Sequence, residues 1–188
     1  QEGQDASFAN PSLTGRLEWA GPGLRLGGSF WYGGSANQVA AVGTGTFDAP
    51  VAVLAADARY DTGPFSFRGE AARVSVGGAD RINAAFNQDV GSRMDGFYVE
   101  GGCNLFQLFA PASPSRLIAF ARHERFNTQA AVPTGTIQDL TLARRISTFG
   151  LTFKPSSNVV FKADYQLQRN RAAVGQVNAL SLGAGYQF

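Results

Sequence analysis

The chain has 188 residues, 44% of them hydrophobic and 16% charged, and its 16 basic residues nearly balance its 14 acidic ones. The charged fraction lies below the roughly 25% typical of soluble domains, yet no segment holds the ~18 consecutive apolar residues that a membrane-spanning helix needs. The charges are interspersed, so we expect no nucleic-acid partner. The single cysteine, Cys103, excludes an internal disulfide and a thiolate metal cluster, and we expect neither a metal site nor a cofactor.

Residues 1–12 are polar and show no strand pattern, so we interpret them as an N-terminal segment or an external loop. The opening residues 1–5 lack the basic region and the apolar core of a signal peptide. Strands joined by turns and loops are predicted for the rest of the chain, residues 13–188.

From residue 13 onward, apolar and polar residues alternate in successive segments, which is the pattern of strands with two different faces. In the first segment one face carries Leu13, Gly15, Leu17 and Trp19, and the other carries Thr14, Arg16 and Glu18. The scheme recurs in residues 24–32, 52–60, 65–71, 97–105, 117–124, 148–154, 159–168 and 180–188. The pattern predicts an all-β, antiparallel fold with about nine strands, within a range of eight to ten.

The polar face of these strands carries full charges, often as close pairs of opposite sign. These residues are Arg16, Glu18, Arg25, Asp57, Arg59, Arg68, Glu70, Glu100, Arg122, Glu124, Lys154, Lys162 and Asp164. A soluble β-sandwich turns its apolar faces inward, whereas a transmembrane barrel turns apolar residues toward lipid and polar residues toward its lumen. Alternation alone does not separate these two folds.

The connections and the aromatic residues favour the barrel. Short connections near residues 21–23, 61–64 and 155–158 alternate with long ones near 34–50, 77–93 and 127–145, as periplasmic turns and external loops do. Residues 106–115 form a longer turn, and the spacing of Ile82, Ala85 and Phe86 predicts a short helix within 78–88. Aromatic residues near strand ends suit the two interfacial girdles of a barrel, although a sandwich core is the alternative for them. They are Trp19, Phe30, Tyr32, Tyr60, Phe65, Phe97, Phe153, Tyr165, Tyr186 and Phe188.

Five segments resemble the C-terminal half of Gram-negative outer-membrane porins of the phosphate-selective type. They read NPSLTGRLEW (10–19), FARHERFNTQ (120–129), FGLTFKP (149–155), VVFKADYQ (159–166) and LGAGYQF (182–188). The resemblance implies a sixteen-strand-type passive pore in the bacterial outer membrane, surrounded by outer-membrane lipid and able to form a homotrimer. It marks strands rather than a solute site, and the chain has no lysine ladder of the kind that a dedicated phosphate pore uses.

The end of the chain carries a further likeness. Tyr186 and Phe188 resemble the signal that the barrel-insertion machinery reads on the last strand of outer-membrane barrels. If that strand runs toward the periplasm, counting back nine strands places the start of the first strand outside the cell. Bacterial barrels with both termini in the periplasm have even strand numbers. We therefore expect the C-terminal part of a larger barrel, with a hidden or miscounted strand as the alternative.

The function expected from these features is passive diffusion of small hydrophilic or mildly anionic solutes, without enzymatic activity. The charged residues predicted to line the lumen are seven basic and six acidic ones, and rings of such charges set the selectivity of pores. This near balance predicts a weak preference for anions. One alternative is a small closed outer-membrane barrel with a structural or adhesive role.

A second alternative is an outer-membrane lipid hydrolase built around His123, the single histidine. Such an enzyme pairs a histidine with a serine or an acidic residue. However, Arg125 rather than a serine shares the face of His123 two residues further on, and Glu124 points to the other face. The apolar-face alternation also places Cys103 toward lipid, where we expect it to be inert.

Overall fold

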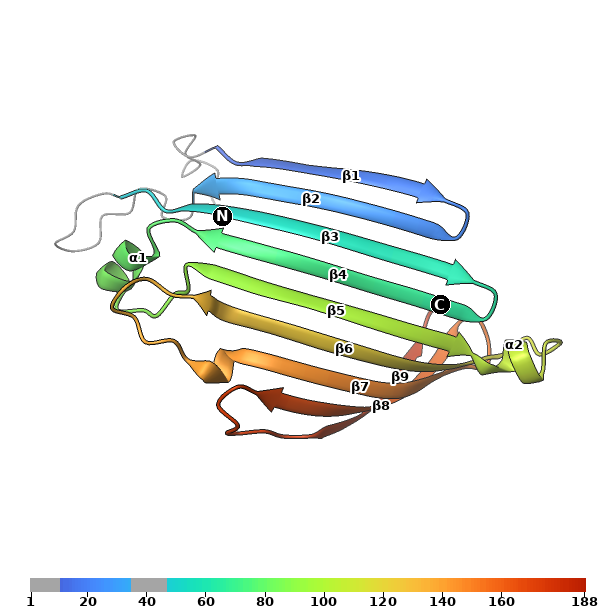
Figure 1. Cartoon of the computed structure of the whole chain (residues 1–188). Helices are drawn as coiled ribbons and strands as arrows, with labels where there is room; N and C mark the ends of the chain where they lie inside the picture. The colour runs from blue at the N-terminus through green and yellow to red at the C-terminus, as the bar shows by residue number, and fades with distance from the viewer. Residues whose placement is uncertain (1–10, 35–46) are drawn as a thin grey trace.

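The computed structural model describes residues 11–34 and 47–188, and the structural statements below refer to these ranges. The described strands form one antiparallel sheet in which each strand pairs with its neighbours in sequence (Figure 1). Their bounds are β1 (Leu13–Gly21), β2 (Leu24–Gly34), β3 (Pro50–Thr62), β4 (Phe65–Val76), β5 (Arg93–Asn104), β6 (Arg116–Ala131), β7 (Ala143–Lys154), β8 (Val159–Asn170) and β9 (Ala179–Tyr186). The predicted all-β antiparallel fold, with nine strands in the described ranges, is confirmed.

The sheet is curled but open. In Figure 1 the strands β8 and β9 turn away behind β5 to β7, so the sheet has a convex face toward the viewer and a concave face behind it. β1 and β9 stand at the two ends of the strand order and do not pair, and no second sheet covers either face in the described part of the chain. The structure thus gives a single curved layer, without the closure that a barrel requires.

The connections fall into two groups at opposite ends of the sheet. The turn end holds the connection of residues 22–23, that of residues 63–64, the segment with helix α2 (Leu105–Phe109), and that of residues 155–158. Gly23 adopts a left-handed backbone with φ of 71°, and a Cβ there would lie 2.5 Å from the backbone oxygen of Asp61. Glycine suits this position because it alone avoids both penalties. The first hairpin therefore packs closely against the start of the second turn.

The loop end holds the longer connections and a small apolar cluster. Helix α1 (Ala79–Phe86) confirms the short helix predicted within residues 78–88, and a 3-10 helix covers Leu140–Leu142. Ile82 and Ala85 of α1 pack against the buried side chains of Phe47 and Ala49. Most of the predicted loop 34–50 and of the predicted N-terminal segment 1–12 lies outside the described residues. None of the helices in the described ranges combines the length and apolarity needed to cross a membrane.

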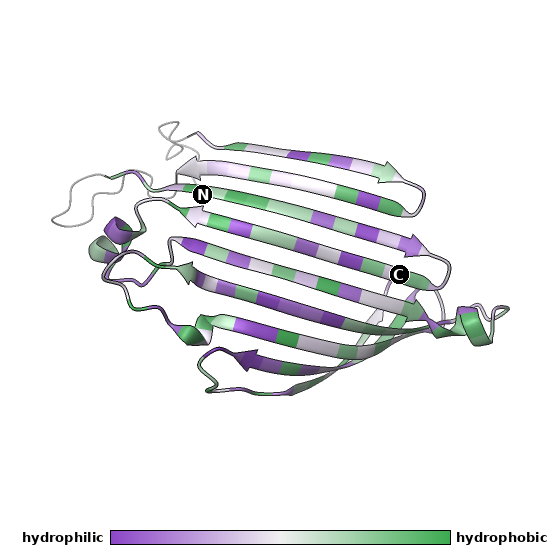
Figure 2. Ribbon diagram, in the orientation of Figure 1, coloured by the Kyte–Doolittle hydropathy of each residue, from purple (hydrophilic) through white to green (hydrophobic). Residues whose placement is uncertain are grey.

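The two faces of the sheet differ in composition and in exposure. Figure 2 shows hydrophobic and hydrophilic residues alternating along the strands. Large apolar side chains stand exposed on the convex face; Leu17 is 81% exposed and Leu182 is 78% exposed. On the concave face Thr148 and Asp164 are buried among their neighbours. The buried apolar side chains of the described residues all lie at the loop end, so the sheet itself covers no apolar core.

Candidate functional site: the charged concave face

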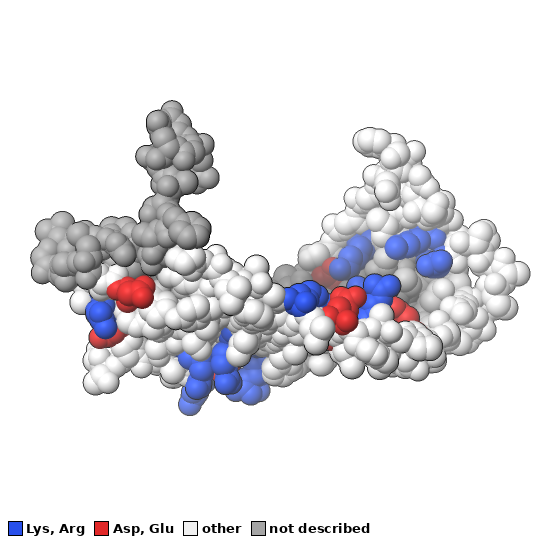
Figure 3. Space-filling model, turned by 90° about the horizontal axis from the view of Figure 1, so that it is seen from above, with Lys and Arg blue, Asp and Glu red and all other residues white. Residues whose placement is uncertain are grey.

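The concave face brings together all the charged residues that the alternation assigned to the lumen. The cross-strand register places each of them on the same side of the sheet. Figure 3 looks along the sheet from above and shows acidic and basic side chains gathered in its hollow. Most of the remaining surface in this view carries no charge, so the hollow is a concentrated polar surface.

Register divides these charges into rows that run across the strands. Arg25, Arg59 and Arg68 are directly opposite one another on β2, β3 and β4, and we call them the concave arginine row. One row further toward the loop end, Asp57 stands opposite Glu70. A basic row therefore lies beside an acidic one, an arrangement that a count of seven basic against six acidic residues does not reveal.

Arginine contacts neutralise part of the acidic row. Arg16 reaches from β1 across β2 to Asp57 on β3, with its Nη1 2.7 Å from Oδ2, and its Nη2 lies 3.1 Å from Oε2 of Glu18. Gly27 makes this crossing possible, because a Cβ at that position would overlap the Arg16 guanidinium. On β6, Arg122 Nε lies 2.5 Å from Oε1 of Glu124. Arg16 and Arg122 each contact two carboxylates, so these contacts offset only part of the negative charge of the wall.

Several cations of the concave face have no carboxylate partner in the described ranges. Arg59 contacts Asp61 at 2.7 Å, and Lys162 stands 4.0 Å from Asp164. In contrast, Arg25, Arg68 and Lys154 make no ion pair with any described residue, and Glu70 is the one carboxylate of the predicted set without such a partner. The seven basic and six acidic residues of the predicted set carry a net charge of +1, so the face is weakly positive.

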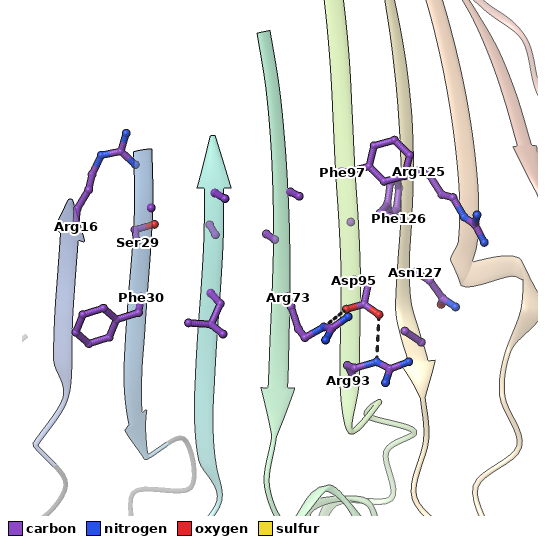
Figure 4. Close-up of a pocket in the computed structure, with 18 of the residues that line it drawn as sticks. Arg16, Ser29, Phe30, Arg73, Arg93, Asp95, Phe97, Arg125, Phe126 and Asn127 are labelled. Carbon is purple, nitrogen blue, oxygen red and sulfur yellow. Dashed lines mark hydrogen bonds and ion pairs between the residues drawn. The ribbon is translucent and has the colours of Figure 1, made fainter. Parts of the chain in front are cut away.

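Small side chains open space beside these charges. Ser29, Ala55, Ala72 and Gly96 are opposite one another on four consecutive strands, and they line a hollow of about 1200 Å³. A second hollow of about 370 Å³ is lined by residues of both charged rows. Figure 4 shows part of the larger hollow. The arrangement can hold water and small solutes against a charged wall, because the row of Ser29, Ala55, Ala72 and Gly96 carries only small side chains.

The register also reveals a polar pair that the alternation missed. Ser147 of β7 stands opposite His123 of β6 on the convex face, and His123 Nδ1 lies 3.0 Å from Ser147 Oγ. The serine is 24 residues away in sequence, so no local motif signals it. The described residues place no hydrogen-bond partner on the other ring nitrogen, and the ring of Phe97 lies 6.4 Å from the imidazole.

The other residues singled out by sequence lie apart from the hollow. Tyr186 ends β9 on the convex face opposite Val159, and its ring centroid is 6.2 Å from that of Phe188. Cys103 also lies on the convex face, is partly exposed and forms no disulfide. Within the described ranges no three His, Cys, Asp or Glu side chains come together in a geometry that could hold a metal ion.

Hydrogen bonds join two of the loops at the loop end of the hollow. The buried Gln129 donates from Nε2 to the Asp89 backbone oxygen, and its Oε1 accepts from the Asp139 N–H at 2.6 Å. The hydroxyl and the N–H of Thr141 donate to Asp139, and these bonds lower the pKa of its carboxyl group. Gln138 also donates to the Gln129 backbone oxygen. Gln129 thus connects the loop before β5 to the loop after β6.

Removing this connection is expected to loosen both loops. Gln129→Ala removes two hydrogen bonds to loop backbone groups, each of which stabilises by roughly 0.5–1.5 kcal/mol. Amide hydrogen exchange should accelerate in residues 77–92 and 132–142 and stay unchanged at the turn end. Gln107→Ala, an exposed glutamine of α2, is the control and should leave exchange in both loops as it is. Equal exchange in the two variants would contradict a tethering role for Gln129.

Comparison with known proteins adds a limited likeness. No family model matches the chain. A protein of Aquifex aeolicus (strain VF5) described as "Uncharacterized protein" is 34% identical over 73 residues. The aligned stretch covers 39% of this chain and 16% of that protein, so the chain spans well under two thirds of its relative's length.

Proposed function

We propose that the chain forms the wall of a porin-type channel in a bacterial outer membrane, through which small hydrophilic or mildly anionic solutes diffuse passively. One observation carries this proposal: a single curved sheet presents exposed apolar side chains on its convex face and charged side chains on its concave face. A soluble β-sheet buries its apolar face, so this arrangement is typical of a transmembrane barrel.

The extent of the apolar surface supports a membrane location. On β8 the convex face is apolar from Val159 to Leu167, nine residues, and the facing strands add Phe149, Leu151 and Leu182. A tilted transmembrane strand needs ~9–11 residues to cross the hydrocarbon. Soluble monomers rarely expose contiguous apolar patches larger than a few hundred Å². Lipid is therefore the solvent that suits the convex face.

The open sheet suits a barrel wider than nine strands. Barrels of about sixteen strands enclose an aqueous channel, whereas eight-stranded barrels are filled by side chains. The row of small residues Ser29, Ala55, Ala72 and Gly96 favours the wider, water-filled interior. We extend the proposal to a sixteen-strand-type barrel, inserted by the outer-membrane barrel machinery and able to assemble as a homotrimer.

Single-channel recording tests the proposal. The full-length protein that contains this chain, folded into planar lipid bilayers, is expected to give stepwise conductance in potassium chloride, with a slightly higher permeability to chloride. Protease protection of the inserted strands verifies insertion in the same preparation. Insertion without conductance would contradict the channel and support the small closed barrel, and failure to insert would overturn the membrane assignment itself.

Ester hydrolysis is a second candidate, favoured by the contact between His123 and Ser147. A serine hydrolase also needs a group that orients the histidine and free N–H donors for the oxyanion. The described residues supply no group that orients the histidine. The backbone N–H groups of β6 and β7 take part in strand pairing on both sides, which leaves no free donors for an oxyanion. Fatty-acid release from phospholipid vesicles that is lost in Ser147→Ala would favour hydrolysis over the channel.

A further inference from the structure

Three arginines form a second row, on the convex face. Arg125, Arg145 and Arg169 lie directly opposite one another on β6, β7 and β8, and all three are exposed. We call them the convex arginine row. Strands are spaced ~4.8 Å apart, so the row spans roughly 10 Å. It lies near the loop end of these strands, on the face whose middle and turn end are apolar.

The convex row carries charge without internal compensation. Arg125 and Arg145 make no ion pair or hydrogen bond with the described residues, and Arg169 donates only to neutral oxygens of Gln168 and Asn178. Like charges directly opposite on neighbouring strands destabilise a sheet. Three aligned guanidinium groups therefore favour the binding of an anion from outside the chain.

The surroundings of the row add to its positive charge. On β4 and β5, Arg73 and Arg93 both contact Asp95, at 2.7 Å and 3.1 Å, as Figure 4 shows. This end of the convex face thus carries five arginines and one aspartate, a net charge of +4. Figure 3 shows basic side chains projecting from the side of the sheet opposite the charged hollow.

The row lies at the border of the apolar surface. In the next row toward the turn end stand His123, Ser147 and Leu167, and beyond them come Phe149 and Tyr165. Moving from the loop end toward the turn end, the convex face therefore changes from basic to polar to apolar. A lipid leaflet changes in a matching way, from charged phosphate groups at its surface to hydrocarbon in its interior.

We propose that the convex arginine row binds the phosphate groups of an anionic lipid in the leaflet on the loop side of the membrane. The inference rests on the proposed function, because only a membrane-inserted sheet brings this face against lipid. Arginine guanidinium groups bind phosphate through paired, charge-assisted hydrogen bonds. A lipid with two phosphate groups matches a row of this length better than a single phosphate does, since it contacts more than one arginine.

Lipid retention tests the proposal. The full-length protein is folded into phosphatidylcholine vesicles containing a minor share of lipid A, a glycolipid with two phosphate groups, then extracted in mild detergent, and bound lipids are quantified by mass spectrometry. The wild type is expected to retain lipid A in excess of its share. Replacing Arg125, Arg145 and Arg169 with glutamine should reduce this retention roughly tenfold or more, the loss expected when charge-assisted contacts are removed.

The control removes the same charge from the other face. The variant with Arg25, Arg59 and Arg68 replaced by glutamine should retain lipid A as the wild type does, and added inorganic phosphate should not displace the lipid. Arg145→Gln provides a second readout. Without anionic lipid, this variant should unfold at the same temperature as the wild type or a higher one, because the like-charge contacts of Arg145 with Arg125 and Arg169 are removed.

The outcomes separate this inference from the proposed function. Insertion and conductance with equal lipid A retention in the wild type and the convex-row variant would overturn the lipid site and leave the channel intact. Displacement by inorganic phosphate would overturn the lipid as ligand and assign the row to free anions. Failure to insert would overturn both, since the row would then meet no leaflet.

Discussion

Replacing Ala56 with arginine is expected to destabilise the membrane-inserted protein by roughly 2–4 kcal/mol, the cost of a cation on the lipid face of a barrel near the bilayer midplane. Ala56 is at the centre of β3, on the convex face, opposite Gly28 and Ala71. Among the described residues no acidic side chain stands beside it on that face, so the new guanidinium would lack a partner.

Ala55 supplies a matched control one residue away. It is also an alanine of β3 but faces the concave side, opposite Ser29 and Ala72, beside the larger hollow. Ala55→Arg should leave the unfolding free energy nearly unchanged, because water and the nearby Asp57 solvate the added charge. The measurement is equilibrium unfolding in urea of each variant inserted in phosphatidylcholine vesicles.

A soluble β-sheet predicts the opposite order of destabilisation for these two substitutions. In a soluble sheet, arginine at the exposed Ala56 would alter stability by less than ~0.5 kcal/mol, as surface substitutions usually do. Ala55 is less exposed than Ala56, so in a soluble sheet Ala55→Arg would reduce the unfolding free energy more than Ala56→Arg would. A larger loss for Ala55→Arg than for Ala56→Arg would therefore contradict lipid contact along the convex face.

The face of each strand could be predicted from the sequence because side chains alternate with a period of two. Leu13 and Arg16 were assigned to opposite faces from this rule alone, and the register confirms that they are on opposite faces. The predicted hairpins also hold, because short connections carrying Gly23 and Gly63 restrict how the next strand can return. Local chemistry thus determined the faces and the order of the strands.

Contacts across strands could not be predicted in the same way. The opposition of Ser147 to His123 depends on the register of β6 and β7, which the length of the loop between them sets. A shift of one residue would have moved each side chain to the other face. The strands also continue past the recognisable alternation: β6 ends at Ala131, beyond the predicted end at residue 124.

The convex arginine row was missed for the same reason. Arg125, Arg145 and Arg169 belong by parity to the apolar face, but they lie beside the apolar stretches of their strands and do not interrupt them. Considered one at a time, each is an ordinary charged residue at the end of a strand. Their alignment is a property of three pairings that only the folded sheet provides.

Under the proposed function, reversing the charge of the concave arginine row is expected to change the ion preference of the channel from weakly anionic to cationic. Substituting glutamate for Arg25, Arg59 and Arg68 changes the row from +3 to −3, beside carboxylates that Arg16 only partly neutralises. Rings of charged side chains determine the selectivity of a pore through the local concentration of counterions. The proposed channel would thus owe its ion preference to these charges and not to a narrow binding site.

The reversal potential in a potassium chloride gradient measures this change, and its sign is expected to invert. The effect should weaken at high salt, because screening shortens the range of the row's field to ~3 Å at 1 M ionic strength. The control substitutes glutamate for Arg125, Arg145 and Arg169, which changes the same charge on the convex face and should leave the reversal potential as it is. An equal shift of the reversal potential in both variants would mean that the ions respond to the overall charge of the protein. A shift confined to the concave variant would identify the concave face as the wall of the conducting path.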